Sequence, residues 1–404
     1  MGNSVSSEPE AGSSSELFER YEIGKVLGAG AFGEVRACSP KFEDDDFPEA
    51  CALKIVDLQG AATQAAEGFK AAREELDIME QLVHPNVVKL VQVYEDPRFL
   101  YVVMERVDGG ELFEAISNER AEILEADVAR IGLQLMQALE YLHGIGIVHR
   151  DIKAQNILLT RAPHIPGRAL AKSDIKLIDF GLAGRLPKEC IANERSERQL
   201  DLVCGSPAMV APEVWSTQAS APKQWKDNWG ERYGARVDVF AAGVVLYLAL
   251  LGKLPFMAND LAELARVVCD PNVKPNFTSR HRGHQVSSGA RKCLSSMLEK
   301  DLLNRTCSSN ACGDRWLTGQ RRSRAVSEPI PAEVRRGAAQ EAQAALKMRF
   351  PEASSPAPSA QELAERGAAF EAARVAWSQG GPQEDCNSIS SESDDEERPA
   401  WSLF

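Results

Sequence analysis

Five short motifs follow one another in a fixed order along this chain of 404 residues, and that order constrains the fold more than any other feature. They are a glycine-rich stretch, a lysine after two apolar residues, a polar loop, an Asp-Phe-Gly tripeptide and an Ala-Pro-Glu tripeptide. They lie at residues 28–35, 52–54, 149–156, 179–181 and 211–213. Each tripeptide occurs often by chance, but chance does not produce the whole ordered series. We therefore expect the motifs to serve one site.

The glycine-rich stretch reads G-A-G-A-F-G-E-V, and its small residues let backbone N–H groups approach phosphate oxygens closely. A dinucleotide-binding turn has the same G-x-G-x-x-G spacing, but its glycines open a helix, whereas Glu34 and Val35 here continue as a strand. A glycine-rich hairpin without a ligand is the alternative for this motif by itself. The candidate phosphate-binding residues are Gly28, Ala29, Gly30, Ala31, Phe32, Gly33, Glu34 and Val35.

Lys54 follows Ala52 and Leu53 on the next predicted strand. An amine there can reach the α and β phosphates of a nucleotide if an anion holds it in place. Glu75, on the helix predicted over 70–82, is the candidate anion, and Glu74 is the alternative. The ordinary state of a glutamate is a solvated surface carboxylate, so this pairing is a specific expectation.

The polar loop at 149–156 reads H-R-D-I-K-A-Q-N and brings a carboxylate, a cation and an amide together. Asp151 can accept or orient the proton of a substrate hydroxyl, and Lys153 can neutralise a transferring phosphoryl group. Asn156 can hold a metal ion, and Asp179, after the apolar strand predicted at 175–178, provides a second metal ligand.

On these motifs, residues 21–317 resemble a eukaryotic protein kinase catalytic domain of the serine/threonine type. Further matches at 87–90, 103–105 and 109–113 are most similar to the calcium/calmodulin-dependent kinase group. The resemblance implies an α+β, two-lobed protein kinase fold, with a small antiparallel β lobe carrying one main helix and a large, mainly α-helical lobe. It also implies transfer of the γ-phosphoryl group of ATP to protein serine or threonine hydroxyls in signalling, with ATP and Mg²⁺ as cofactors.

Two rival functions remain open at this point. The first is a pseudokinase scaffold that only binds partners. Loss of Lys54, Asp151, Asn156 or Asp179 would favour it, and all four residues are present. The second is a small-molecule kinase, which the Ala-Pro-Glu tripeptide disfavours.

The resemblance also assigns roles to residues outside the motifs. Adenine would lie between Leu27, Val35, Ala52 and Leu158, with Met104 as gatekeeper and the backbones of Glu105 and Val107 bonding the adenine edge. Ser206 would contact the catalytic loop, and Glu213 would pair with Arg305 to tie the substrate platform to the large lobe. Met79, Leu90, His149 and Phe180 would stack as an internal spine anchored by Asp238.

Glu111 belongs to the same resemblance, at the edge of the ATP site. It matches a position that can favour a basic residue three before the phosphorylated one. Gln155 replaces a glutamate that strengthens this preference in basophilic relatives, so we expect a moderate bias. A lysine two residues after the catalytic aspartate, as Lys153 follows Asp151, is the pattern of serine/threonine kinases.

The activation segment departs from the family pattern. The usual phosphothreonine aligns with Leu202, which has no hydroxyl, although its partner Arg150 is kept. Three alternatives are open: Asp201 offers a fixed negative charge, Ser196 is modified, or the segment needs no switch.

Composition divides the chain into three parts. Residues 1–20 are rich in Ser, Glu and Gly and are expected to form a mobile tail, 21–317 the kinase domain, and 318–404 a mostly disordered regulatory tail. A short helix is predicted near 360–378, where Leu363, Phe370 and Trp377 recur every seven residues. The segment 216–232 looks like an insertion.

The tails carry partner motifs. The N-terminus M-G-N-S-V-S fits N-myristoylation at Gly2, which alone gives weak, reversible membrane contact. Ser327, three after an arginine, would bind a 14-3-3 protein once phosphorylated. Calmodulin binding is disfavoured but not excluded, because glutamates offset the basic residues of 360–378.

The net charge of −13 argues against a nucleic-acid partner. The nine cysteines show no metal-ligand spacing and fit reduced thiols. The longest apolar run, at 239–251, is too short to span a bilayer, and no apolar signal sequence opens the chain. We therefore expect a cytoplasmic protein that can also contact membrane surfaces.

Overall fold

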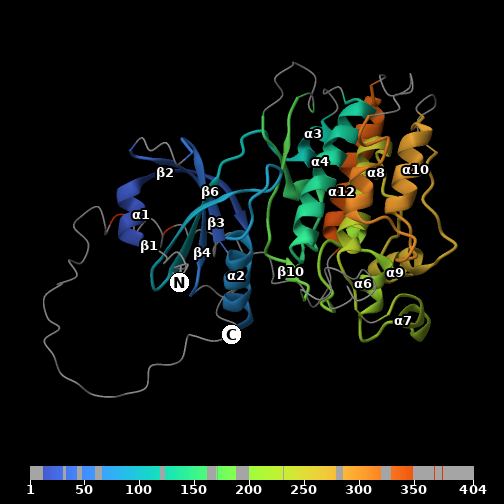
Figure 1. The fold of residues 1–404 in the computed structure, drawn as a ribbon, viewed down its shortest axis with the longest axis horizontal. Helices are drawn as coiled ribbons and strands as arrows, with labels where there is room; N and C mark the ends of the chain where they lie inside the picture. Colours follow the sequence, from blue (N-terminus) through green and yellow to red (C-terminus); the bar gives the residue numbers. More distant parts are fainter. Residues whose placement is uncertain are drawn as a thin grey trace, which may run out of the picture.

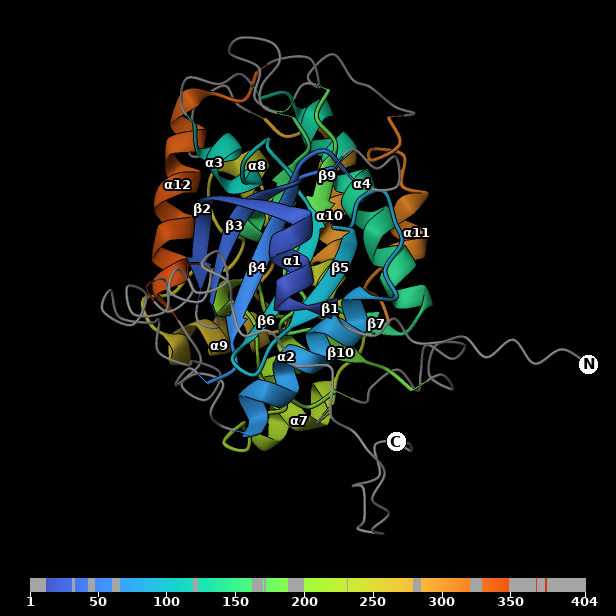
Figure 2. The same cartoon turned by 90° about the vertical axis from the view of Figure 1, so that its left-hand side faces the viewer.

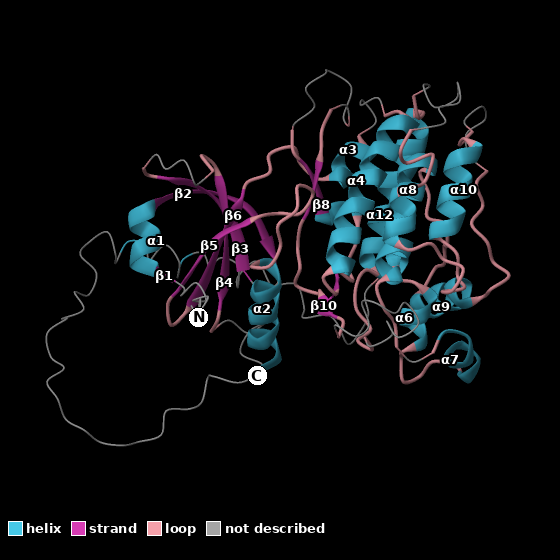
Figure 3. Cartoon of the chain, in the orientation of Figure 1, coloured by secondary structure: helices cyan, strands magenta, loops and turns pink. Residues whose placement is uncertain are grey.

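The chain folds into two lobes, one built mainly from strands and the other mainly from helices (Figures 1 and 3). The computed structural model describes residues 12–30, 33–42, 48–59, 66–118, 123–161, 170, 172–187, 200–230, 232–278, 285–319 and 329–348, with the single residues 368 and 375. This architecture is the two-lobed kinase fold that the sequence predicts.

The small lobe contains one six-stranded sheet in the order β1-β5-β6-β4-β3-β2. Its strands are β1 (Gly12–Ser13), β2 (Tyr21–Gly30), β3 (Gly33–Pro40), β4 (Cys51–Asp57), β5 (Leu90–Glu95) and β6 (Phe99–Glu105). The five long strands pair antiparallel, as expected, but the short β1 runs parallel to β5, so the sheet is mixed.

Side chains alternate between the two faces of this sheet. Leu53 and Ile55 of β4 pack in a cluster on the outer face, whereas Val56 packs with Leu76 of α2 (Ala66–Met79) on the inner face. Lys54 therefore projects toward α2. The helix predicted over 70–82 is this α2, which begins four residues earlier and ends three earlier.

Residues 12–20 are ordered, so the expected tail over 1–20 is wrong for this part. Ser13 caps α1 (Ser14–Arg20) with a capping box to Glu16. Leu17 and Phe18 of the helix are buried against the outer face of the sheet, where Phe18 meets Tyr101 edge to face. Figure 2 shows α1 lying across this face. The small lobe thus includes a helix before Tyr21.

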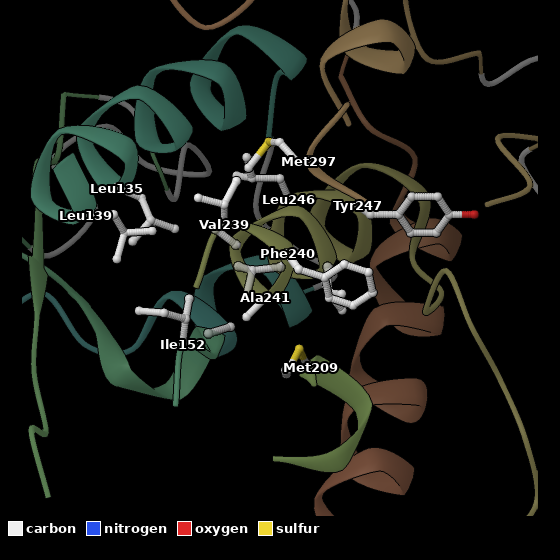
Figure 4. Packing of buried hydrophobic residues seen from close by; sticks show 14 of the residues in the cluster. Leu135, Leu139, Ile152, Met209, Val239, Phe240, Ala241, Leu246, Tyr247 and Met297 are labelled. Atoms are coloured by element: carbon white, nitrogen blue, oxygen red, sulfur yellow. The ribbon is translucent and has the colours of Figure 1, made fainter. Parts of the chain in front are cut away.

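The large lobe is organised around α8 (Arg236–Leu251), whose side chains are buried on nearly every side. A helix that is hydrophobic all round belongs in a core. In Figure 4, Leu135 and Leu139 of α4 (Glu125–Gly144) face Val239 of α8, whereas Phe240 of α8 points away from α4 within the same core. The other helices are α3 (Leu112–Ser117), α6 (Pro212–Ser216), α7 (Lys223–Trp229), α9 (Leu261–Cys269), α10 (Ser288–Met297) and α11 (Ser308–Cys312).

Four short strands lie where the lobes meet. They are β7 (Ile147–Val148), β8 (Ile157–Leu159), β9 (Ile175–Leu177) and β10 (Gly184–Arg185), paired as β7 with β10 and β8 with β9. These two ribbons carry the polar loop and the Asp-Phe-Gly tripeptide. Among the described residues, no helix is both long enough and apolar enough to cross a membrane.

The ordered large lobe continues past residue 317, contrary to the expected boundary. Helix α12 (Ala332–Lys347) packs against α3 and α8 (Figure 2). Ile330 and Val334 are buried there, and a Cβ at Gly252, which has φ of 63°, would lie 1.7 Å from the carbonyl oxygen of Val334. The predicted helix near 360–378 lies almost wholly outside the described residues.

The segment 216–232 also has a structure of its own. Residues 223–229 of it form α7, whose Trp229 is buried and donates from Nε1 to the carbonyl of Lys300 at 2.9 Å. The segment is therefore packed onto the large lobe rather than looping away from it.

Candidate active site

Lys54 and Glu75 form an ion pair between β4 and α2. The amine of Lys54 lies 2.6 Å from Oε1 and 2.7 Å from Oε2 of Glu75. Glu74, the alternative partner, instead pairs with Lys70 on the exposed side of the helix. Burial alone would lower the pKa of Lys54, but the carboxylates of Glu75 and Asp179 outweigh it and raise that pKa. Lys54 is therefore a fixed, charged amine.

The glycine-rich stretch is the hairpin between β2 and β3. Gly30 pairs with Gly33 at its tip, and Ala31 and Phe32 lie outside the described residues. A Cβ at Gly33 would lie 1.7 Å from the carbonyl oxygen of Ile55, so only glycine fits this position. The hairpin thus continues as a strand on both sides, as the sequence predicts, and lies against β4, which carries Lys54.

Asp151 is the most heavily hydrogen-bonded side chain of the polar loop. Its Oδ1 accepts from the N–H of Ser206 at 3.1 Å and from the Ser206 hydroxyl at 3.0 Å. Its Oδ2 accepts from Lys153 and, at 3.1 Å, from Nδ2 of Asn156. The carboxylate is therefore held in one orientation by Lys153 and Asn156 of the same loop and by Ser206 of the activation segment.

Asp179 interacts electrostatically with both lysines of the site, Lys54 and Lys153. Burial favours its neutral acid, but Lys54 and Lys153 outweigh burial and hold the pKa of Asp179 below its ordinary value. Its backbone has φ of 67°, a left-handed conformation that the surrounding residues must fix. Because Asn156 donates through Nδ2, its carbonyl oxygen remains as an acceptor. An ionised carboxylate and an amide oxygen form a donor set that fits Mg²⁺.

The polar loop is anchored from beneath by Asp238 of α8. Its carboxylate accepts from the backbone N–H groups of His149 and Arg150 at 2.9 and 2.8 Å. Burial would raise the pKa of Asp238, but hydrogen bonding to His143 outweighs burial and lowers it. The ring of His149 lies 5.0 Å from that of the buried Phe180, so these two members of the predicted spine are in contact.

The residues expected around adenine lie on neighbouring strands where the lobes meet. Ala52 of β4 pairs with Met104 of β6, and Val35 lies on the adjoining β3. Leu158 of β8 is bridged to Glu111 from the large-lobe side. Leu27, near the end of the hairpin, is 45% exposed, so it borders the region rather than closing it. Val107 follows β6 in the connection between the lobes.

Glu105 in this connection has a partner that the sequence analysis missed. Its Oε1 accepts from Nζ of Lys176 at 2.6 Å and from the backbone N–H of Lys89 at 2.7 Å. Lys176 lies three residues before Asp179, so one ion pair links the connection to the Asp-Phe-Gly strand. Nothing in the local sequence signals this pairing, because the two partners are far apart in the chain.

Glu111 occupies the N-cap position of α3, beside the polar loop, and its side chain forms no capping hydrogen bond. Burial and the neighbouring Glu114 raise the pKa of Glu111, and Lys153 offsets part of that rise. A carboxylate here gives the large-lobe side of the site a negative group.

Glu213 and Arg305 are paired in the large lobe. Both side chains are fully buried, and Nη2 of Arg305 donates to Oε2 of Glu213 at 2.9 Å, alongside a second bond from Nη1. The guanidinium also lies over the ring of Phe240. The Ala-Pro-Glu segment is thereby tied to the core of the large lobe. Gly2 and Ser327 lie outside the described residues.

The geometry thus joins two amines, three carboxylates and an amide around the junction of two lobes. The model of the protein kinase domain matches residues 21–317. The chain belongs to the protein kinase family. Protein kinases use ATP and Mg²⁺, which fits the charged amine of Lys54 and the oxygen ligands of Asp179 and Asn156.

Several characterised kinases are similar to this one. Serine/threonine-protein kinase DCLK2 of Homo sapiens is 32% identical over 308 residues, which cover 76% of this chain and 35% of that protein. Serine/threonine-protein kinase 33 of Bos taurus is 30% identical over 318 residues, covering 79% and 58%. Myosin light chain kinase A of Dictyostelium discoideum is 29% identical over 303 residues, covering 75% and 89%. The alignment therefore spans about a third of the length of DCLK2.

Proposed function

We propose that this kinase transfers the γ-phosphoryl group of ATP to serine and threonine hydroxyls of proteins, in signalling. The observation that carries the proposal is the set of bonds on Asp151, whose two oxygens are held by Ser206, Lys153 and Asn156. A carboxylate fixed in this way is oriented to receive a hydroxyl proton. Two of the similar proteins are named as serine/threonine-protein kinases, which supports the same class of acceptor.

Each polar residue of the site would have one task. Asp151 would accept or orient the proton of the incoming hydroxyl, and Lys153 would neutralise charge on the transferring group. Lys54, held by Glu75, would bind the α and β phosphates. Asp179 and Asn156 would hold Mg²⁺, which supplies charge neutralisation at the phosphate oxygens. The chain would thus act by positioning and electrostatic stabilisation.

The adenine and phosphate pockets follow the same proposal. The backbone of 28–35 would cover the phosphates, and the adenine would lie between the strands of the small lobe and β8. The backbones of Glu105 and Val107 would bond its edge. The support is that these residues line the same junction as Lys54, and that Lys176 fixes the side chain of Glu105.

We also propose a moderate preference for substrates with a basic residue three before the acceptor. The support is the position of Glu111 at the start of α3, close enough to Lys153 to interact electrostatically. A partly buried carboxylate offers a basic side chain a partner that water screens less than it would at the open surface. Placement of this kinase in the calcium/calmodulin-dependent group stays a proposal that rests on the sequence motifs.

The tails lead to proposals about location. Myristoylation at Gly2 would give a cytoplasmic protein that contacts membranes weakly and reversibly. Phosphorylated Ser327 would bind a 14-3-3 protein, and calmodulin stays a disfavoured partner. Mass spectrometry of the N-terminal peptide and of the 321–328 region would test the two modifications directly.

Transfer of γ-phosphate from Mg-ATP to peptides with serine, threonine or tyrosine acceptors tests the main proposal. We expect transfer to serine and threonine, and a fall in kcat of about 100-fold or more in Asp151→Asn, with ATP affinity kept. The matched control is Asp227→Asn, an exposed aspartate of α7, which should change kcat less than twofold. No transfer by the wild type, despite measurable ATP binding, would favour the scaffold function instead.

A further inference from the structure

The guanidinium of Arg150 is surrounded by neutral oxygen acceptors. It donates to the carbonyls of Leu182 and Ala183, at the start of the activation segment, and lines one small cavity together with Tyr233. Within the described residues no carboxylate forms an ion pair with it, and Asp201 is exposed. Burial alone would lower the pKa of Arg150, but the surrounding polar groups outweigh burial and raise it. Arg150 is therefore a fixed, charged donor beside Asp151.

Tyr233, on the other side of that cavity, contacts the far end of the activation segment. Its side chain is fully buried, and its hydroxyl donates to the carbonyl of Leu202 at 2.6 Å. Its backbone forms two more bonds with Leu200, of 2.7 and 3.1 Å. Burial raises the pKa of Tyr233, so the hydroxyl keeps its proton and remains a donor to Leu202.

The segment that Tyr233 holds leads directly to the reacting side of the site. Residues 200–204 lead to Ser206, whose N–H and hydroxyl orient Asp151. None of these five residues carries a hydroxyl that could be phosphorylated. The cavity between Arg150, Tyr233 and Asp238 measures about 20 Å³, which has room for about one water molecule and not for a phosphate group.

We propose that Tyr233 is a positioning residue whose hydroxyl, by donating to the carbonyl of Leu202, orders the 200–206 segment for catalysis without a phosphate on that segment. This inference rests on the kinase activity proposed above. A phenylalanine would keep the ring in its pocket and the backbone bonds to Leu200, and would lose only the hydrogen bond to Leu202.

Tyr233→Phe in the full-length chain tests the hydrogen bond to Leu202, with Tyr247→Phe as the matched control. Tyr247 is a buried tyrosine of α8, and its hydroxyl also donates to a loop carbonyl, that of Asn276. Amide hydrogen exchange is followed for peptides covering 200–206, with a peptide of α4 as internal reference. We expect exchange in 200–206 to speed up about fivefold to tenfold in Tyr233→Phe only, which is the effect of one typical hydrogen bond.

The kinetic measurement uses protein treated with a broad-specificity phosphatase and checked by mass spectrometry for the absence of phosphate. The wild type should keep its kcat within twofold, and Tyr233→Phe should lose about fivefold to tenfold in kcat with KM for ATP unchanged.

Two outcomes would overturn the inference. One is equal exchange and equal kcat in Tyr233→Phe and Tyr247→Phe, because the hydroxyl would then position nothing. The other is loss of wild-type activity on removal of phosphate from the activation segment. The exchange result does not depend on catalysis, so it separates this inference from a failure of the proposed activity itself.

Discussion

The amine of Lys54 lies between the two carboxylate oxygens of Glu75, at 2.6 and 2.7 Å. The pair joins β4 to α2, so the position of the helix and the position of the amine are coupled. Its side chains are only about one-fifth and one-eighth exposed, at 22% and 12%, so water screens the interaction weakly. This geometry presents the amine toward Asp179 on the other lobe.

We expect Lys54→Met to lower kcat/KM for MgATP at least about 100-fold, because it removes a charge aimed at the phosphates. Glu75→Gln should cost about tenfold, since the amine stays but is no longer fixed. The control is Lys70→Met, which breaks the exposed Lys70–Glu74 pair of the same helix and should change little. Steady-state kinetics at varied ATP measures all three, and equal losses in Lys54→Met and Lys70→Met would refute the assignment.

Residues that share one motif could be predicted from the sequence. Asp151, Lys153 and Asn156 lie within a single loop, so their mutual contacts follow from spacing along the chain. Glu75 could be selected over Glu74 only through the family resemblance, because both lie on the same helix. The structure separates them by side: one turns inward to β4 and the other outward to Lys70.

Contacts between distant segments could not be predicted. Phe18 is buried because it meets Tyr101, and Val334 because it meets Gly252, and neither partner is near in sequence. The polar composition of both flanking segments therefore predicted tails where the structure has helices. One usable signal was present, since Ser13 and Glu16 form a capping box. The contact of Tyr233 with the activation segment likewise depends on pairing with Leu200, which is distant in the sequence.

The buried pair of Glu213 and Arg305 leads to a prediction about stability. Glu213→Gln should lower the free energy of unfolding by about 3–5 kcal/mol, because it leaves the guanidinium buried without its counter-charge. The control is Lys274→Met, which removes one partner of the exposed Lys274–Glu299 pair and should cost less than about 1 kcal/mol. Urea denaturation measures both, and a cost for Glu213→Gln as small as the control would contradict the prediction.

The packing of α12 predicts where the chain can be shortened. A chain ending after Met348 should keep the midpoint of thermal unfolding, whereas one ending after Leu317 should unfold several degrees lower, because Ile330 and Val334 leave a buried interface. Arg335 adds to that loss, since its Nε donates to the carbonyl of Asn118 at the end of α3 at 3.0 Å.

Single substitutions in the full-length chain separate packing from length. Val334→Ala should cost about 1–3 kcal/mol, and Glu333→Ala, on the exposed side of the same helix, should cost less than about 0.5 kcal/mol. Equal unfolding midpoints for the chains ending at 317 and 348 would show that α12 contributes nothing to the fold.

The buried amine of Lys300 leads us to expect that the free energy of unfolding depends on pH. Its amine is buried, donates to the carbonyls of Val267 and Asp270 at 2.8 and 2.6 Å, and lies 4.5 Å from the centre of the Phe256 ring. Burial lowers the pKa of Lys300 to about 8, from the ordinary 10.5. Between these two values the unfolded chain binds more protons than the folded one, so this group makes the free energy of unfolding rise with pH.

The measurement is the free energy of unfolding in urea at pH 7.5 and pH 9.5, for the wild type and for Lys300→Met. Other groups titrate in both proteins, so they cancel when the two pH differences are subtracted. We expect the wild type to gain, relative to the variant, about 2 kcal/mol at most on going to pH 9.5. A relative change of zero would mean that the folded protein keeps Lys300 charged throughout, and a relative loss would mean that its pKa is raised. Lys300→Met keeps the backbone carbonyl that Trp229 uses, so the packing of α7 should survive the substitution. The hydrogen bonds of the amine are lost at both pH values, so the pH difference reports the titration of Lys300.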